Sequence, residues 1–368
     1  MKYCLFFVFV FSYLSGCIPV RSIFLGSPDK SDLLRFHSNE IKADTNCFIF
    51  KKSDSPGLSK LKVNDWSTDI PFFINLNDLA TKHKVRSFLV IQNDTLKYEY
   101  HNKKLQRDAL HSSYSIAKSF ISALIGIAIE EGLIKSVNES VTTYIPELKK
   151  IKYAKYLQIE HLLNQTSGIK YRFRLDVNLY YGANIIKQLK TIEFDTIPGR
   201  TQHYLNINTQ LLGIVLNRAT NMSIAAYMQE KIWKPLQMCS DAKWSTDKKN
   251  KLEKAFCCIG ATALDYAKLG RLYLNKGTWE GKNVFSEKWY YETIKRDTAN
   301  GSSFNFNYSW HIGLKEYQDF MAIGLYKQHI YINPEKNLII VLLNDKEKKL
   351  LAERVNWWYV FRQIADQV

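Results

Sequence analysis

The stretch SIAKSFISALIGIAIEE, from Ser115 to Glu131, carries the strongest helix signal in the chain. A helix that is apolar nearly all round is buried in a core, and few charges lie on any face of this one. Gly132 follows and is expected to end the helix. The apolar residues that recur at helical spacing are Ile116, Phe120, Ala123, Leu124, Ile127 and Ala128.

Two polar residues lie at the start of this helix. Ser115 and Lys118 are three positions apart, which places them on one face. A serine hydroxyl is a poor nucleophile unless a base accepts its proton. Burial and the positive end of the helix dipole would lower the pKa of Lys118 until its neutral amine can be that base. We therefore expect Ser115 to be a nucleophile and Lys118 its base.

The Ser-x-x-Lys spacing is weak evidence by itself, because it occurs six times in the chain. Only the pair at Ser115 opens a long apolar helix. An unpaired ammonium buried there is strongly unfavourable. The alternative to a chemical role is that Lys118 reaches the surface or pairs with a carboxylate.

A second segment supplies a phenol that can pass a proton to a leaving group. Tyr204 and Asn206 lie between a turn at Ile197–Arg200 and an apolar helix expected over Thr209–Arg218. Residues two apart face the same side of an extended segment. We therefore expect both side chains to point into one cleft with Ser115.

The rest of the chain predicts an α/β fold. Strands are expected before and after a block of short helices and loops at about 135–255, and the chain ends in an amphipathic helix at 348–363. The predicted fold is one sheet lobe interrupted by an inserted all-α lobe. The expected strands are Val85–Ile91, Thr95–Tyr100, Ser309–Gly313, Phe320–Ile323, Gln328–Ile332 and Leu338–Leu343.

The N-terminus has the features of an export signal. Lys2 precedes the ten apolar residues Leu5–Leu14, and Ser15-Gly16-Cys17 follows, which resembles the lipobox of bacterial lipoproteins. We expect residues 1–16 to be a signal peptide and Cys17 to anchor the protein in the bacterial cell envelope. An ordinary signal peptide or a short membrane anchor are the alternatives. Residues 17–80 are interpreted as a tether and N-terminal extension, and 81–368 as the catalytic domain.

Charge and cysteine content bear on possible partners. The net charge of +16 favours anionic neighbours such as phospholipid headgroups, although biased codon usage could also produce the lysine excess. No nucleic-acid motif accompanies the charge, so no nucleic-acid partner is expected. No metal or cofactor is expected, because the histidines are scattered.

Four cysteines are expected to be buried free thiols: Cys47, Cys239, Cys257 and Cys258.

Together these motifs resemble the serine β-lactamase and penicillin-binding superfamily. The most similar branch includes class C β-lactamase-like esterases and 6-aminohexanoate-dimer hydrolase. The resemblance implies an antiparallel sheet flanked by helices, with acylated Ser115, Lys118 as base, Tyr204 as proton shuttle and Asn206 orienting the lysine or the substrate. It rests on HSSYSIAKSF (111–120), HLLNQTSG (161–168), Pro198 to Asn206, IWKPL (232–236) and Ala263–Tyr273.

The family's third element, a Lys-Thr-Gly triplet on a strand, is altered here. The chain has Ala322-Ile323-Gly324, followed by Leu325-Tyr326-Lys327-Gln328. The resemblance implies that the Leu325 and Ser115 amides form an oxyanion hole, and that Gly324, Tyr326 and Gln328 bind substrate. Loss of the triplet lysine argues against penicillin chemistry as the main role. Lys327 could replace it or point to solvent.

The expected function is hydrolysis of an amide or ester through an acyl-enzyme. A peptidoglycan D,D-peptidase or a β-lactamase is the alternative within enzymes. An alternative of another class is a catalytically silent protein that binds envelope peptides. The substrate itself is not predicted, because loops of the helical lobe set specificity.

Overall fold

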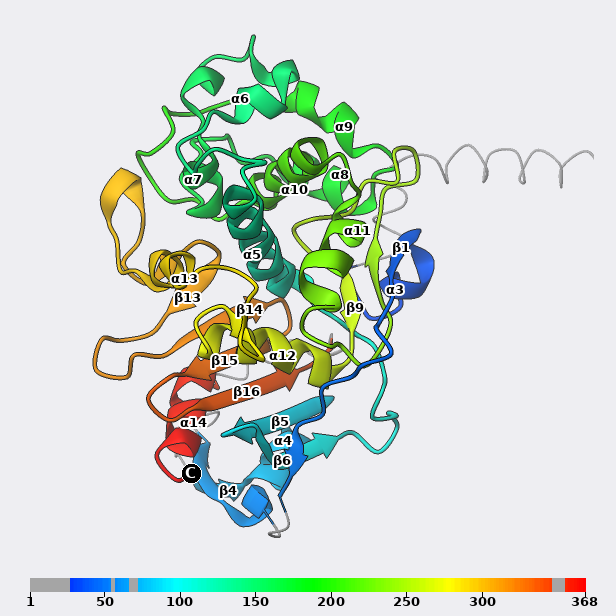
Figure 1. Cartoon of the computed structure of the whole chain (residues 1–368), viewed down its shortest axis with the longest axis vertical. Helices are drawn as coiled ribbons and strands as arrows, with labels where there is room; N and C mark the ends of the chain where they lie inside the picture. Colours follow the sequence, from blue (N-terminus) through cyan, green and yellow to red (C-terminus); the bar gives the residue numbers. More distant parts are fainter. Residues whose placement is uncertain (1–26, 54–56, 66–71, 346–354) are drawn as a thin grey trace, which may run out of the picture.

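The computed structural model describes residues 27–53, 57–65, 72–345 and 355–368. Short helices gather at one end of the molecule and a large sheet lies at the other (Figure 1). Helix α5 (Ala117–Glu130) runs between them, and it is buried over most of its length. The mixed α/β fold with antiparallel strands and flanking helices is therefore confirmed.

The large sheet has the strand order β12-β13-β14-β15-β16-β5-β6-β2. Neighbouring strands are antiparallel except β2 and β6, which are parallel. All six predicted strands are present, with ends shifted by two residues or fewer. The bounds are β2 (Lys51–Lys52), β5 (Ser87–Gln92), β6 (Thr95–His101), β12 (Phe306–Asn307), β13 (Trp310–Ile312), β14 (Phe320–Gly324), β15 (Gln328–Asn333) and β16 (Leu338–Leu343).

Both faces of this sheet are covered, because alternate side chains of a strand point to opposite faces. Leu89 and Ile91 of β5 belong to the main core, whose α12 (Ala263–Leu274) packs on β15 and β16. Phe88 and Val90 belong to a second core on the other face. That core includes α4 (Leu76–Lys82) and α14 (Trp357–Ala365). The predicted final helix is thus present from residue 357, while 346–354 lie outside the described residues.

The helical lobe packs against α5 through its longest helix, α10. A π-helical turn at Gln229–Trp233 continues the last helix, α11. The chain then enters a small sheet that the sequence did not predict, in the order β1-β8-β9-β7. The lobe contains α6 (Val141–Tyr144), α7 (Ile159–Leu163), α8 (Phe173–Tyr181), α9 (Ile185–Gln188), α10 (Asn206–Thr220) and α11 (Ile224–Met228); the sheet contains β1 (Ser38–Ile41), β7 (His111–Ser112), β8 (Ala242–Ser245) and β9 (Ile259–Ala261).

The remaining elements lie at the edges of the two lobes. The segment that was interpreted as a tether and extension contributes strands to three sheets, through β1, β2 and the β3–β4 hairpin. These further elements are α3 (Asp32–Arg35), β3 (Lys62–Asp65), β4 (Phe72–Asn75), β10 (Thr278–Trp279), β11 (Lys282–Asn283) and α13 (Glu287–Ile294), with short 3-10 turns between them.

The prediction of free thiols is wrong for all four cysteines. Cys47 pairs with Cys239, and Cys257 pairs with its neighbour Cys258. The first pair joins positions 192 residues apart, which no local spacing reveals. The second occurs in a turn where Cys258 has a φ of 73°, a left-handed conformation that is uncommon for a residue with a Cβ.

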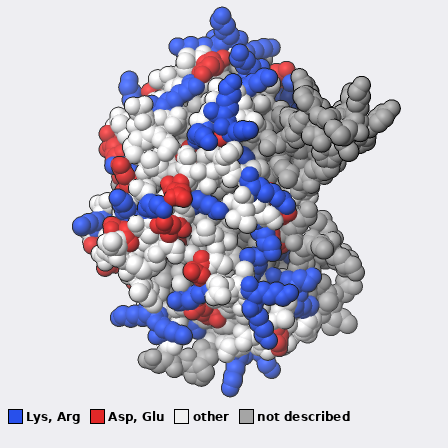
Figure 2. Space-filling view, turned by 90° about the vertical axis from the view of Figure 1, so that its right-hand side faces the viewer, with Lys and Arg blue, Asp and Glu red and all other residues white. Residues whose placement is uncertain are grey.

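Basic side chains are spread over the face drawn in Figure 2, with acidic side chains between them. Within the described part of the chain, no helix is long and apolar enough to cross a membrane. The same residues contain no group of three or more His, Cys, Asp or Glu side chains that could hold a metal ion. The predicted signal peptide and Cys17 lie outside the described residues.

Candidate active site

Ser115 lies in a 3-10 turn, Tyr114–Ile116, that leads directly into α5. The residue before it, Tyr114, has a φ of 41° and a buried ring. Non-glycine residues rarely adopt this conformation, and where they do the surrounding packing must hold it. The Tyr326 ring packs edge-on against Tyr114, with 5.2 Å between ring centroids. The backbone that presents Ser115 is therefore a fixed, sharp turn.

Lys118 lies one helical turn further on and is buried, with 1% of its surface exposed. Its Nζ lies 3.0 Å from Ser115 Oγ, 3.0 Å from Asn206 Oδ1 and 2.9 Å from the backbone oxygen of Phe256. Among the described residues, no carboxylate hydrogen-bonds to this amine. Burial lowers the pKa of Lys118 to about 7, while the charge of Asp176 acts in the opposite direction.

These contacts orient the lone pair of a neutral Lys118. A neutral amine has two N–H donors and one lone pair. The oxygens of Asn206 and Phe256 are acceptors only, so each requires an N–H. The lone pair is then left for the Ser115 hydroxyl, which can donate its proton. The arrangement can therefore convert Ser115 into a nucleophile.

Tyr204 and Asn206 both reach this pair, as the Tyr-x-Asn spacing predicted. Asn206 is the first residue of α10, and Tyr204 lies in the loop directly before it. The Tyr204 ring centroid is 5.0 Å from Lys118 Nζ. Loss of solvent raises the pKa of Tyr204 to about 12, and a hydrogen-bonding interaction with Ser115 partly opposes this. Tyr204 is still 45% exposed, so its ring can also face a substrate.

The end of β14 lies against the turn that carries Ser115. A Cβ added to Gly324 would lie 2.6 Å from the backbone oxygen of Ser113, so only glycine permits this approach. The close contact places Leu325, 47% exposed, beside the start of the catalytic helix. This location is compatible with the predicted oxyanion hole.

Two predicted substrate contacts have structural partners instead. Gln328 is fully buried, and its amide exchanges hydrogen bonds with the backbone of Asn344, at 2.7 and 2.9 Å. The Tyr326 hydroxyl donates to the backbone oxygen of Pro28 at 2.7 Å. Gln328 therefore joins neighbouring strand ends, and Tyr326 holds the N-terminal segment. We leave both out of the proposed substrate site.

Three groups of the site were missed by the sequence reasoning. Burial raises the pKa of Asp176, on α8, while Lys118 and a hydrogen bond from Asn206 lower it. Burial and the charge of Lys118 lower the pKa of His311, on β13, to about 4. The third group is the Phe256 carbonyl, and a backbone atom leaves no signal in a sequence. Asp176 and His311 lie in no motif that would distinguish them.

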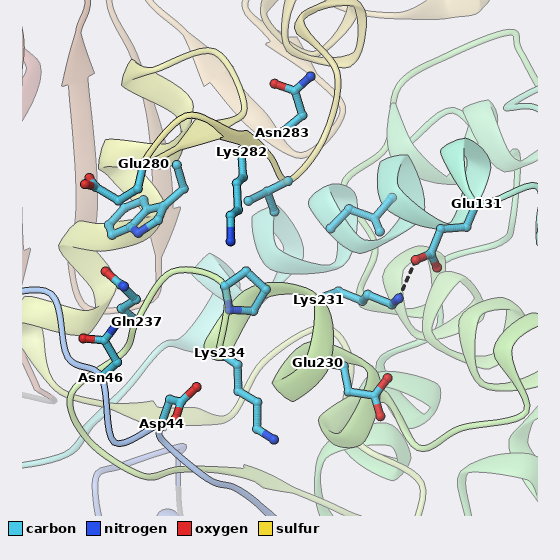
Figure 3. A pocket seen from close by; sticks show the side chains of 14 residues that line it. Asp44, Asn46, Glu131, Glu230, Lys231, Lys234, Gln237, Glu280, Lys282 and Asn283 are labelled. Carbon is cyan, nitrogen blue, oxygen red and sulfur yellow. Dashed lines mark ion pairs between the residues drawn. The ribbon is translucent and has the colours of Figure 1, made fainter.

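A separate cavity of about 520 Å³ lies near the π-helical turn and the β10–β11 hairpin (Figure 3). Its walls carry charges of both signs, including the ion pair between Lys231 and Glu131. Ser115, Lys118 and Tyr204 do not line it. The site described above is therefore distinct from this cavity.

Comparisons with known proteins show the family and the fold of this chain. The Beta-lactamase family matches residues 86–364. The 6-aminohexanoate-dimer hydrolase of Paenarthrobacter ureafaciens is 24% identical over 288 residues, covering 70% of this chain and 72% of that protein. A Bacillus anthracis structure, provisionally assigned to the same activity, has a TM-score of 0.79 at 24% identity, with 90% of each chain covered. A Bacteroides dorei structure, provisionally assigned as a beta-lactamase, has a TM-score of 0.63 at 14% identity, covering 74% of this chain and 89% of that one.

Proposed function

Because the chain belongs to the beta-lactamase family and is a serine hydrolase, we propose that it cleaves an amide or ester through an acyl-enzyme on Ser115. The observation that carries this proposal is the buried Lys118 amine, 3.0 Å from Ser115 Oγ and without a hydrogen-bonded carboxylate in the described structure. Such an amine is neutral for a large share of molecules near pH 7.

The proposed reaction has two halves. Lys118 accepts the Ser115 proton, and Oγ attacks the substrate carbonyl carbon to form a tetrahedral oxyanion. The amides of Ser115 and Leu325 stabilise the oxyanion. Tyr204 passes a proton to the leaving amine or alcohol, and the carbon–leaving-group bond breaks. Water then attacks the acyl-enzyme with the same groups acting in reverse, releasing the acid and restoring Ser115.

We favour a small linear amide or ester over a β-lactam. Ala322 stands where the penicillin-recognising members of the family carry a lysine, so the cation that binds a β-lactam carboxylate is absent from that position. The similarity to a 6-aminohexanoate-dimer hydrolase supports an amide, without identifying the substrate.

Probe labelling tests the proposal. A fluorophosphonate should label the wild-type protein on Ser115, and Ser115→Ala should abolish both labelling and hydrolysis, with turnover lowered by at least about 10³-fold. Labelling by penicillin would instead support the D,D-peptidase or β-lactamase alternative. Hydrolysis that persists in Ser115→Ala would refute the proposed nucleophile, and absence of any labelling or turnover would support a silent binding protein.

We also propose export and lipid attachment at Cys17. The N-terminal sequence supports this, and two disulfides are in keeping with an oxidising compartment. Cys17→Ser should release the protein from the membrane fraction or leave the signal uncleaved. Unchanged membrane partitioning with normal processing would contradict the anchor.

A further inference from the structure

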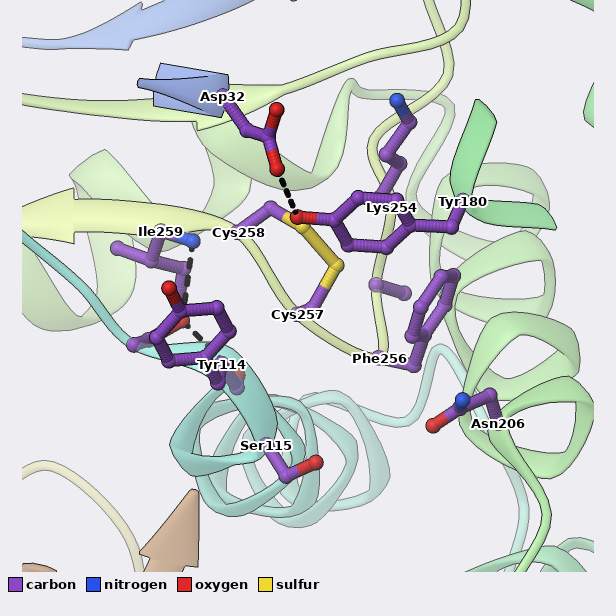
Figure 4. Close-up of a disulfide and its surroundings, with 12 residues drawn as sticks. Asp32, Tyr114, Ser115, Tyr180, Asn206, Lys254, Phe256, Cys257, Cys258 and Ile259 are labelled. Atoms are coloured by element: carbon purple, nitrogen blue, oxygen red, sulfur yellow. Dashed lines mark hydrogen bonds between the residues drawn. A yellow bond between two sulfur atoms is a disulfide. The ribbon is translucent and has the colours of Figure 1, made fainter. Parts of the chain in front are cut away.

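The Cys257–Cys258 disulfide lies in a short segment that contacts the catalytic helix at one end and Ser113, the residue before its leading 3-10 turn, at the other. On one side, the Phe256 carbonyl accepts the hydrogen bond from Lys118. On the other, Ile259 exchanges two hydrogen bonds with Ser113, at 2.7 and 3.0 Å. Figure 4 shows the disulfide between Phe256 and Ile259, above the helix start that carries Ser115.

The turn that contains the disulfide is also held by hydrogen bonds from two residues of β8. Trp244 Nε1 donates to the Cys257 carbonyl at 2.8 Å, and the Ser245 amide donates to the Cys258 carbonyl at 3.1 Å. Both cysteines are almost fully buried. Cys258 has positive φ, a conformation that a residue with a Cβ leaves easily unless it is held. The covalent link between the two side chains restricts the movement of Cys258 out of this conformation.

We propose that the Cys257–Cys258 disulfide positions the catalytic base, by holding the Phe256 carbonyl against Lys118. The inference rests on the proposed role of Lys118. When the disulfide is broken, the turn can relax and the carbonyl can rotate away. One N–H of the neutral amine then lacks its acceptor, and the lone pair is no longer directed at Ser115.

A dithiol reductant breaks this bond when a local opening of the turn exposes the sulfurs, without global unfolding. One thiolate of the reductant attacks a cysteine sulfur, breaks the S–S bond and forms a mixed disulfide. Its second thiolate then closes a cyclic disulfide and releases the cysteine. The reductant loses two electrons, and Cys257 and Cys258 each end as a thiol.

The second disulfide of the chain is a matched control. Cys47–Cys239 closes a separation of 192 residues, and among its neighbours is Lys268 rather than Lys118. A disulfide that closes a long loop stabilises the fold mainly by restricting the unfolded chain, whereas a link between adjacent residues restricts it very little. Opening Cys257–Cys258 should therefore affect mainly kcat, whereas opening Cys47–Cys239 should affect mainly the melting temperature.

Paired variants test the proposal. Cys257→Ser/Cys258→Ser should lower kcat roughly 10- to 100-fold, because small displacements of a catalytic group are costly, while the melting temperature changes little. The acidic limb of kcat/KM should also move to lower pH, because the lost carbonyl favoured the charged amine. Cys47→Ser/Cys239→Ser should lower the melting temperature clearly, with kcat within about 2-fold of wild type.

Reduction provides a test that does not depend on refolding a variant. Dithiol treatment of the folded wild type should reproduce the loss of kcat, with alkylation and mass spectrometry identifying the opened pair, and reoxidation should restore activity. The Cys257→Ser/Cys258→Ser protein should show no further loss. Unchanged kcat and pH profile after verified opening of this pair would overturn the inference. Hydrolysis that survives Ser115→Ala would instead overturn the proposed function, so the two failures are distinguishable.

Discussion

Two buried lysines each follow a polar residue by three positions along the chain, yet their surroundings differ. Lys118 of α5 follows Ser115 by three residues, and Lys268 of α12 follows Asp265 by three. Each is 1% exposed. Lys268 Nζ lies 3.2 Å from Asp265 Oδ1 and donates to a backbone carbonyl at 2.7 Å. Lys118 has only neutral partners at hydrogen-bonding distance.

The comparison separates a structural cation from a candidate base. Burial lowers the pKa of both amines, but Asp265 opposes this for Lys268 through its charge and a hydrogen bond. For Lys118, only the charge of Asp176 opposes the effect of burial, and the pKa falls to about 7. The residue three positions before the lysine therefore distinguishes an ion pair from a catalytic pair.

Lys118→Met should give the largest effect among the lysine variants. Without the base, kcat should fall by about 10³-fold, whereas the free energy of unfolding should stay equal or rise, because an apolar side chain replaces a buried amine. Steady-state kinetics and urea unfolding measure the two quantities. If turnover of Lys118→Met stayed within 10-fold of wild type, Lys118 would not be the catalytic base, and the proposed difference between the two lysines would be wrong.

Tyr204→Phe should lower kcat by roughly 10²-fold, because Lys118 acts with a phenol partner. The ring remains, so its edge contact with Phe306 and the fold should survive. A double variant with Lys118→Met should fall little below the single variant, since the two residues act as a unit. Fully additive losses would show that the two residues work independently.

Lys268→Met should affect stability instead of catalysis. It leaves the buried Asp265 carboxylate without its cation, which should lower the free energy of unfolding by roughly 3 kcal/mol. Asp265 keeps its hydrogen bonds from Thr262 and Cys239. We therefore expect the loss of stability to lie at the lower end of the roughly 3–5 kcal/mol that breaking a buried ion pair costs. We expect kcat to stay within about 2-fold of wild type. A large loss of kcat in a folded protein would contradict the purely structural role.

The pH dependence of both activity and stability should reflect the lowered pKa of Lys118. Lys118 is protonated below about pH 7, so kcat/KM should fall as the pH falls through that value. Between about 7 and the ordinary lysine value of 10.5, the unfolded chain binds a proton that the folded one does not. Stability should therefore rise with pH across that window, and Lys118→Met should lack this component. Urea unfolding of both proteins at two pH values checks the sign.

Asp176→Asn should produce the smallest effect. Removing its negative charge lowers the pKa of Lys118 further, so the acidic limb of kcat/KM should move to lower pH by less than about one unit. The pH–rate profile of the variant measures the shift. A limb that moves to higher pH would show that Asp176 does not act on Lys118 through its charge.

The sequence revealed the parts of the molecule that depend on local pattern. The helix after Ser115 and the strands from Phe320 to Leu343 have strong periodicity, and the Ser115–Lys118 pair needs only one helical turn. The small sheet escaped prediction because its strands are short and pair across long separations, as Ser38 does with Ser245. Tertiary contact alone brings them together.

The same reason limits prediction of the site. Tyr204 and Asn206 could be recognised because they form a motif with the helix that follows. The Phe256 carbonyl reaches Lys118 from 138 residues away and is a backbone atom, so no residue type marks it. Gln328 was selected by a motif match, which cannot show that Asn344 already uses its amide.

The contacts of the N-terminal segment have a mechanical consequence. Pro28 accepts a hydrogen bond from Tyr326, in the turn after Gly324, and Asp32 accepts one from Tyr180 at 2.8 Å. A pull on the chain from its N-terminal side would act on these two bonds and on the ion pair between Lys30 and Asp345. Tyr326 also packs on Tyr114, the residue before Ser115, so the force would reach the turn that presents the serine. The N-terminal segment and the catalytic turn are thus coupled in series, and tension on one would strain the other.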